Sequence, residues 1–234
     1  MKFLILTCLA ALAAFGCSPD VAVNTSKEVK VLANQIEKPL DLMPLTTGSA
    51  WTYEVRQTIR NNQGQTGSGE VQSTLKVTGR KGRATTVAVI QDNKVRSTIT
   101  FAETDKGISQ SHIKDSAGAV RSFDPPIPTF QWPMKLEETR TWTGSGYRSA
   151  IGSTGKMTST LTYKGELELD TPAGRMRAHR FDTVQKYKSG EAEYGSMQSV
   201  WFVPKVGIAR SLEISSSPQG VRETDMKLKT YTVK

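Results

Sequence analysis

Residues 84–101 read ATTVAVIQDNKVRSTITF, and apolar and polar side chains alternate on both sides of the central QDNK. Val87 and Val89 share one parity before it, and Val95, Ile99 and Phe101 share one parity after it. A period of two places alternate side chains on opposite faces of a strand. Asp and Asn are typical turn residues. The stretch therefore predicts two antiparallel strands joined by a tight turn.

The same alternation continues along the chain from Trp51 to the C-terminus. Apolar side chains recur on one parity at Leu75 and Val77, at Leu161 and Tyr163, at Leu167 and Leu169, and at Leu212 and Ile214. Glycine-, proline- and asparagine-containing turns such as GRKGR, DTPAG and SSPQG separate these segments. Val, Thr and Tyr are favoured in strands. We predict a mainly β body of roughly ten antiparallel strands.

The N-terminus has the layout of an export signal. Lys2 precedes an apolar run from Phe3 to Phe15, which Gly16 and Cys17 follow. The run is too short to span a bilayer comfortably. The layout resembles a bacterial lipoprotein signal. This resemblance implies cleavage after Gly16, diacylglycerol on the Cys17 sulfur and a third acyl chain, such as palmitate, on the new amine. The alternative is an ordinary secretory signal that is cut near the same position.

Acylation at Cys17 would fix the protein to a membrane. A single acyl chain gives marginal, reversible binding, whereas two or three chains anchor a protein stably. In enteric bacteria an Asp directly after the cysteine retains a lipoprotein at the inner membrane, and this chain has Ser18. We therefore expect a lipid-anchored protein of the cell envelope, at the outer membrane rather than the inner membrane.

Composition limits the other partners. The net charge of +9 falls to +8 when Lys2 is removed with the signal. The basic residues are scattered between apolar positions, which is typical of solvated sheet faces, although attraction to anionic headgroups or acidic glycans is an alternative. Export and the absence of a binding motif argue against nucleic acid. Cys8 and Cys17 are the only cysteines, so we expect a body without disulfides.

Three regions follow along the chain: a signal peptide at 1–16, a lipidated tether at 17–43 and a β-rich domain at 44–234. Within the tether, TSKEVKVLANQIEK (25–38) has capping-box and helical apolar spacing, and it predicts one short helix before Pro39. LTTGSAWT (45–52) and LEETRTWT (136–143) share a Leu-to-Trp spacing. They indicate either two similar halves, 44–122 and 135–234, joined by a proline-rich linker at 123–134, or a chance likeness.

Aromatic side chains are the candidate contacts for a ligand or partner. They are Trp51, Tyr53, Phe130, Trp132, Trp142 and Trp201. Some of them are expected to line the concave side of the sheet, and the alternative is that all of them fill the core. The apolar side chains of the linker 123–134 either cap the core or form a contact patch.

Three motifs in order carry a further resemblance. They are PLTTGSAWTYEV (44–55), with the pattern PLxxGxxWxY, ELELDTPAGRMRAHRF (166–181), with a TPAG turn, and SVWFVPKVGIARSLEI (199–214), with WxxPxVG. Together they are similar to a group of largely uncharacterised β-rich envelope lipoproteins. The resemblance implies a curved antiparallel sheet, an open barrel or half-barrel, distantly like the carriers that shuttle lipoproteins and lipids across the periplasm. It implies no catalytic residue.

The chain shows no catalytic or metal-binding pattern. GxSxG is missing, His112 and His179 lack the spacing of a zinc site, and Glu137 and Glu138 are adjacent, so on a strand they point to opposite faces. We expect no cofactor, no metal and no enzyme activity. The leading hypothesis is a membrane-anchored protein that binds an apolar ligand or an envelope protein. The alternatives are a structural or assembly subunit of an envelope complex and, third, a hydrolase of envelope polymers.

Overall fold

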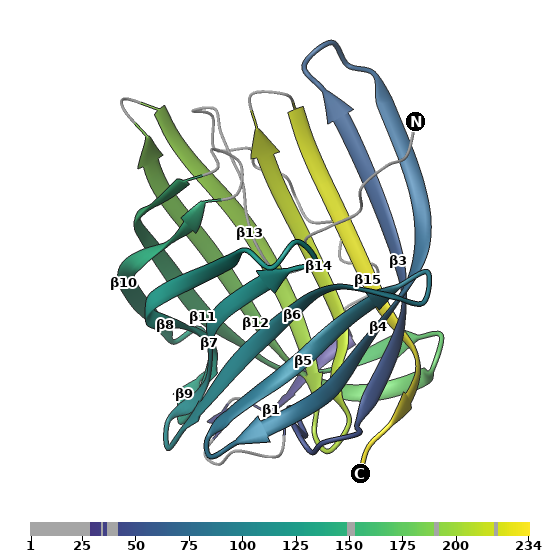
Figure 1. The fold of residues 1–234 in the computed structure, drawn as a ribbon. Helices are drawn as coiled ribbons and strands as arrows, with labels where there is room; N and C mark the ends of the chain where they lie inside the picture. The colour runs from purple at the N-terminus through teal and green to yellow at the C-terminus, as the bar shows by residue number, and fades with distance from the viewer. Residues whose placement is uncertain (1–28, 34, 37–41, 149–152, 190–191, 218–219) are drawn as a thin grey trace.

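A computed structural model describes residues 29–33, 35–36, 42–148, 153–189, 192–217 and 220–234 (Figure 1). The expected signal peptide, Cys17 and most of the tether lie outside these residues. The strands are β1 (Val29–Ala33), β2 (Gln35–Ile36), β3 (Ala50–Asn61), β4 (Thr66–Lys81), β5 (Ala84–Gln91), β6 (Lys94–Thr104), β7 (Gly107–Asp115), β8 (Val120–Gln131), β9 (Met134–Lys135), β10 (Thr139–Arg148), β11 (Ser153–Thr171), β12 (Gly174–Ser189), β13 (Ala192–Val203), β14 (Gly207–Ser217) and β15 (Gly220–Thr232). The mainly β prediction is confirmed.

The sheet closes on itself, so the prediction of an open barrel or half-barrel is wrong. Strands β3 to β8 and β10 to β15 form a closed antiparallel barrel. Closure depends on long-range pairs: β15 runs along β3 from Gly220 opposite Asn61 to Thr232 opposite Ala50. Strand β11 pairs with both β10 and β12. The first and last long strands therefore satisfy each other's backbone groups, which an open sheet would leave exposed.

The prediction of a short helix within 25–38 is also wrong for the part that the structure describes. Residues 29–33 form β1, which pairs with β11, and residues 35–36 form β2, which pairs with β9. The described residues contain no helix. Pairing with an existing strand overrides the weak local preference for a helix.

Alternation along each strand divides the interior of the barrel from its outer face. On β3, Trp51, Tyr53 and Val55 are buried and point inward, while Glu54 and Arg56 are exposed. At this end of the barrel the interior is an apolar core with clustered aromatic rings. Leu42, Met43 and Leu45 pack into the same core just before β3 begins. This end is therefore filled with side chains.

The β11–β12 hairpin bends and crosses the outer face of its neighbours. The register shifts between Tyr163 and Glu166, where Gly165 has a positive φ of 88°. The TPAG turn forms as predicted, with Thr171 opposite Gly174, and the Ala173 amide donates to the Leu228 carbonyl at 3.1 Å. A second, outer apolar cluster results. It consists of Leu167, Leu169, Ala178, Trp201, Val203, Ala209 and Leu212.

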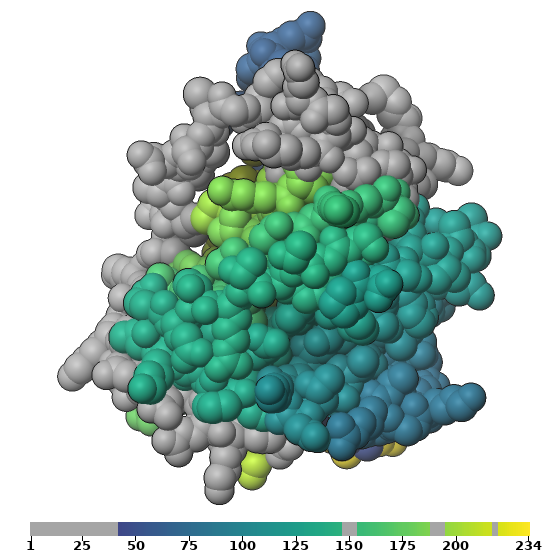
Figure 2. Space-filling model, turned by 90° about the vertical axis from the view of Figure 1, so that its left-hand side faces the viewer, coloured from purple at the N-terminus to yellow at the C-terminus, as the bar shows by residue number. Residues whose placement is uncertain are grey.

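The barrel has one short seam, between β8 and β10. Among the described residues, two register pairs join these strands, Asp124 with Ser145 and Phe123 with Gly146. Strand β8 carries Pro125, Pro126 and Pro128. Because proline has no backbone N–H, it cannot donate to a ladder. Figure 2 views the molecule from the side that carries this seam.

The segment 123–134 is therefore mostly strand. Its apolar side chains Phe123, Ile127, Phe130 and Met134 are buried, which agrees with the expectation that they cap the core. The two similar halves stay a prediction.

Candidate functional site

The interior of the barrel changes from apolar to polar along the strands. On β12 the inward side chains run from Phe181 through Thr183 to Gln185, and on β13 they run from Val200 to Gln198. The period of two persists, but both faces become polar. A cavity remains where the apolar core ends.

The cavity has a volume of about 40 Å³, and with the open space that leads to it about 630 Å³. It lies between strands from opposite sides of the barrel. The lining residues are Phe101, Gln110, Phe123, Ile127, Pro128, Thr129, Thr183, Gln185, Gln198, Val200, Ile208, Ser211 and Met226. A space of about 40 Å³ could hold about three water molecules.

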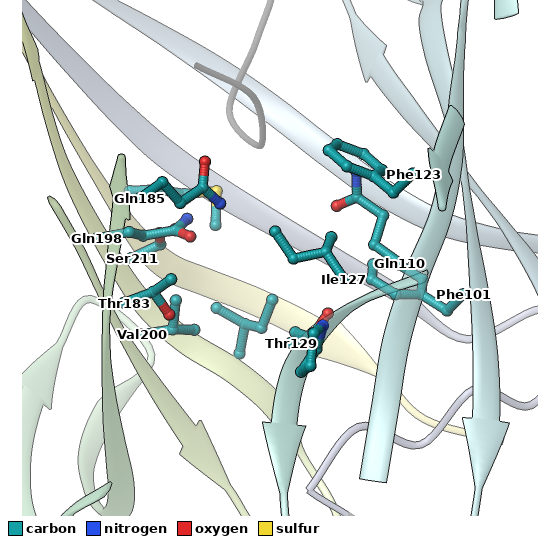
Figure 3. A pocket seen from close by; sticks show the side chains of 13 residues that line it. Phe101, Gln110, Phe123, Ile127, Thr129, Thr183, Gln185, Gln198, Val200 and Ser211 are labelled. Atoms are coloured by element: carbon teal, nitrogen blue, oxygen red, sulfur yellow. The ribbon is translucent and has the colours of Figure 1, made fainter. Parts of the chain in front are cut away.

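The two walls differ in chemistry. Figure 3 shows Phe101 and Phe123 on one side, with the Gln110 amide between them and Ile127 reaching into the space between the walls. The amides of Gln185 and Gln198 project from the opposite wall, next to the Ser211 hydroxyl. An amphipathic ligand, apolar on one side and polar on the other, would match both walls.

Hydrogen bonds satisfy only part of the polar lining. Gln198 Nε2 donates to Ser211 Oγ at 3.1 Å, and outside the cavity lining Gln57 Nε2 donates to Thr224 Oγ1 at 3.4 Å. Gln110 is only 3% exposed, yet its Nε2 has no partner among the described residues. A buried amide donor without a partner is costly. This nitrogen lies beside the Phe123 ring, and the amide oxygen of Gln110 is the atom directed into the cavity (Figure 3).

Glu213 brings an ionisable group to the polar interior. It is two residues beyond Ser211 on β14, and its register partners are Gln198 and Thr224. Burial raises the pKa of Glu213 from its ordinary value of 4.5 to about 7, and the nearby Arg222 guanidinium opposes this shift. The charge of this carboxyl therefore changes near neutral pH.

The structure separates the aromatic residues that the sequence singled out. Trp51 and Tyr53 lie in the apolar core, where Trp51 Nε1 donates to the Val206 carbonyl and Tyr53 OH donates to the Ile208 carbonyl at 3.0 Å. Phe130 is buried in the same core, 4.8 Å from the Phe202 ring centroid. These three side chains are buried, and none of them is among the residues that line the cavity.

The remaining aromatic candidates lie in three different places. Trp132 is half-buried and donates to the Asp105 carbonyl at 3.0 Å. Trp201 lies on the outer face between the Arg180 and Arg210 guanidinium groups, at 5.1 and 5.0 Å. Trp142 points inward, opposite Ser159, which in turn is opposite Gln185. Ligand contact by these aromatics stays a prediction, and Trp142 is the one placed beside the cavity wall.

The glutamine and serine residues of the cavity were missed at the sequence level. A polar residue on the inner face looks like any solvated residue when only the alternation is read. One sequence signal for a polar interior was available. At positions of the same parity the side chains change from apolar to polar, from Val200 to Gln198 and from Phe181 to Gln185. That signal becomes visible only when the inward parity is known.

Other titratable groups have structural partners. Glu137 accepts from Lys164 Nζ at 2.7 Å. Glu138 accepts from the Lys135 amide at 2.8 Å, and this bond together with Arg140 lowers the pKa of Glu138. These two carboxylates hold the turn before β10.

The two histidines lie on separate strands and in different surroundings. His179 Nδ1 lies 2.8 Å from Tyr163 OH, and burial lowers the pKa of His179. His112 Nε2 lies 2.9 Å from Thr100 Oγ1. Among the residues that the structure describes, no group of three or more His, Cys, Asp or Glu side chains could hold a metal ion. No helix in the described ranges is long and apolar enough to cross a membrane.

Comparison with known proteins yields structural neighbours only. No protein-family model matches the sequence, and no curated protein matches it. A candidate exported protein with a YmcC-like fold from Bacteroides fragilis aligns at a TM-score of 0.45 with 10% identity, over 86% of this chain and 99% of its own. A candidate lipoprotein from Parabacteroides distasonis aligns at 0.40 with 9% identity, over 82% and 98%. The hypothetical lipoprotein YmcC from Escherichia coli aligns at 0.41 with 11% identity, over 76% and 84%. Similarity at this level does not extend to function.

Proposed function

We propose that this protein is an envelope lipoprotein that binds a small amphipathic ligand inside its barrel and catalyses no reaction on it. The observation that carries the proposal is the cavity between the Phe101–Phe123 wall and the Gln185–Gln198 wall (Figure 3). Ligand sites in proteins are mostly apolar concavities with a few placed polar groups. This cavity has both kinds of lining within a closed barrel.

The anchor is the part of the proposal that rests on sequence. Acyl chains on Cys17 would hold the protein on the outer membrane and leave the barrel in the periplasm or at the cell surface. Mass spectrometry of the intact protein from the envelope tests this. The expected mass is that of the chain from Cys17 plus a diacylglycerol group and one further acyl chain. An unmodified N-terminus would refute the anchor without affecting the cavity.

A ligand with an acyl chain needs more room than the closed cavity has. Sites for small organic ligands have volumes of about 300–1,000 Å³, against about 40 Å³ here. The short β8–β10 seam is where the barrel can widen at least cost, because only two register pairs would separate. We therefore place ligand access at this seam.

Native mass spectrometry of the full chain, purified from the envelope in dodecyl maltoside, tests ligand binding. We expect a bound lipid to be retained by the wild-type protein and to be lost from Ser211→Leu, whose larger side chain fills the cavity. Ser68→Leu is the matched control, because Ser68 is exposed on β4. Circular dichroism of each variant verifies the fold. Equal retention by a folded Ser211→Leu protein would refute the proposed site.

The structure gives less support to the two other hypotheses. An assembly subunit that binds its partner through Phe130 and Trp132 would need both side chains accessible, and Phe130 is 1% exposed. A hydrolase that uses Glu137 and Glu138 would need free carboxylates, and both accept hydrogen bonds that hold a turn. Binding without catalysis is therefore the function we propose.

A further inference from the structure

The first described strand, β1, joins the barrel near one of its ends. In an antiparallel meander alternate connections lie at the same end, which Figure 1 shows at the bottom, where the C-terminus is marked. We call it the entry end, and its connections are 81–84, 104–107, 131–139, 171–174 and 203–207. Val29 of β1 is the register partner of Glu168, three residues before β11 ends at Thr171. Strand β1 therefore lies close to the entry end.

The length of chain before β1 limits where the proposed anchor can lie. Val29 is 12 residues beyond Cys17, and a fully extended stretch of this length spans at most about 43 Å. The opposite end of β11, at Ser153, is 15 residues from Glu168, or about 50 Å along the strand. A membrane that holds Cys17 is therefore within easier reach of the entry end.

Exposed lysines gather at the entry end. Lys81 flanks the β4–β5 turn, Lys106 lies in the β6–β7 turn and Lys205 lies in the β13–β14 turn. Among the described residues, none of these three lysines has an acidic partner. The acidic side chains of the entry end are already paired, Asp105 with Arg83 at 2.9 Å and the two carboxylates before β10 with other cations. The positive charge of the three lysines is therefore not offset locally.

The described turns at the opposite end carry less unpaired positive charge. These turns are 61–66, 91–94 and 115–120. Asp92 pairs with Arg96 at 2.7 Å. Asp115 pairs with Arg121 at 3.1 Å. Lys94 is the only lysine in these turns. The two ends of the barrel therefore differ, and the entry end presents more cations to an anionic surface.

Two partly exposed aromatic side chains accompany the lysines. Trp132 follows β8, is half-buried, and is held by its indole N–H, which donates to the Asp105 carbonyl beside Lys106. Tyr231, near the end of β15, is 44% exposed, and its register partner is Trp51 at the start of β3. Trp and Tyr are enriched where a protein meets lipid headgroups, because their rings combine an apolar body with a polar atom. The entry end thus combines cations with interfacial aromatics.

We propose that the entry end docks onto the membrane that holds the Cys17 anchor, through contacts of Lys81, Lys106 and Lys205 with anionic lipid headgroups. This inference goes beyond the proposed function, rests on its anchor and does not depend on the cavity. Trp132 and Tyr231 lie at the level of the headgroups in the docked protein. Each lysine changes the ratio of docked to undocked protein about fivefold, which corresponds to about 1 kcal/mol.

The test uses the full-length acylated protein in vesicles that contain a lipid with a nitroxide on its headgroup. A nitroxide quenches tryptophan fluorescence at short range, and Trp132 is more exposed than the buried Trp51, Trp142 and Trp201. We expect quenching in vesicles of phosphatidylethanolamine and phosphatidylglycerol, and little in phosphatidylcholine vesicles. High salt should reduce the quenching because it screens the headgroup charge. Trp132→Phe should remove most of it, which identifies the responding residue.

Replacement of the three lysines tests whether the entry end is the docking surface. Lys81→Gln, Lys106→Gln and Lys205→Gln together should lower the docked-to-undocked ratio about 100-fold. Quenching should then fall to the level seen in phosphatidylcholine vesicles. The matched control removes the same charge from exposed lysines toward the opposite end, by Lys94→Gln, Lys114→Gln and Lys186→Gln. The control should leave the quenching unchanged, and circular dichroism verifies the fold of both proteins.

Flotation of the vesicles distinguishes a failed docking surface from a failed anchor. A protein that floats with both kinds of vesicle but is quenched equally in both would keep the proposed anchor and overturn the docking surface. An equal loss of quenching in the two lysine variants would also overturn it. A protein that floats with neither kind of vesicle would refute the anchor, and the docking surface with it.

Discussion

Glu213 shows how a single side chain links the barrel interior to pH. Its ordinary pKa is 4.5, and burial raises the pKa to about 7 in the folded protein. Between these values the folded protein keeps a proton that the unfolded chain releases. The free energy of unfolding should therefore fall as pH rises through this window.

We predict that Glu213→Gln removes this part of the pH dependence and stabilises the protein at pH 8 by about 1–3 kcal/mol. The Glu213 side chain retains some contact with solvent, which moderates the effect. Urea unfolding of both proteins at pH 5 and pH 8 measures the effect. An identical loss of stability between these pH values in both proteins would contradict the assignment.

Gly144 is a residue where the inner face leaves no room for a side chain. A Cβ there would collide with the Trp142 ring and lie 2.6 Å from the Asp124 carbonyl oxygen. We predict that Gly144→Ala lowers the free energy of unfolding by about 1–3 kcal/mol. Gly67→Ala on β4 is the control, because nothing lies within 4 Å of its Cβ position. Thermal unfolding of the two variants should differ clearly, and equal midpoints would count against the packing described.

At the scale of strands, local chemistry could be predicted and long-range pairing could not. The alternation in β5 and β6 and the turn at Asp92 and Asn93, both with positive φ, follow from neighbouring residues alone. The TPAG turn was predicted on the same basis. The closing β3–β15 ladder joins segments at opposite ends of the domain, and no local period contains it.

The strands at 29–33 and 35–36 illustrate the other limit. Their apolar spacing fits a helix as well as a strand, and pairing with β11 and β9 decides between them. The cavity could not be predicted for a related reason. Inward polar residues such as Gln185 and Gln198 are indistinguishable from outward ones until the barrel closes.

The β8–β10 seam gives a prediction about ligand exchange. Asp124→Cys with Ser145→Cys places two thiols at register partners, where cross-strand Cβ atoms lie about 4.5–5.5 Å apart. Cys8 and Cys17 are the only natural cysteines, so the engineered disulfide has no competitor in a mature chain acylated at Cys17. We expect oxidation to slow ligand exchange several-fold and reduction to restore it.

The control disulfide joins β3 and β15, two strands that pair along their length. Thr58→Cys with Glu223→Cys uses a register pair of β3 and β15. Its oxidation should leave the exchange rate unchanged, as followed by native mass spectrometry after addition of a labelled ligand. If both disulfides slow ligand exchange equally, the ligand does not enter at the β8–β10 seam.

At the scale of the whole molecule, closure makes the two predicted halves depend on each other. Strand β15 of the second half pairs along the full length of β3 of the first, and its backbone also binds the tip of the β11–β12 hairpin through Ala173. Loss of either half would leave backbone N–H and C=O groups of the other half's edge strand without partners. The barrel should therefore behave as one cooperative unit.

We predict a single unfolding transition for residues 44–234, with equal calorimetric and van't Hoff enthalpies. Differential scanning calorimetry of the full-length protein measures both values. Two resolved transitions would instead indicate that 44–122 and 135–234 unfold separately.

The prolines of β8 would have a consequence if the protein stands among its own copies on a membrane, as the proposed anchor at Cys17 implies. If the barrel opens beside Pro125, Pro126 and Pro128, the exposed strand contains three residues without a backbone N–H, divided between its two edges. A strand from a neighbouring chain could not form a regular ladder of backbone hydrogen bonds with this strand. The proposed opening at the β8–β10 seam could thus admit a ligand while disfavouring strand addition between adjacent copies of the protein.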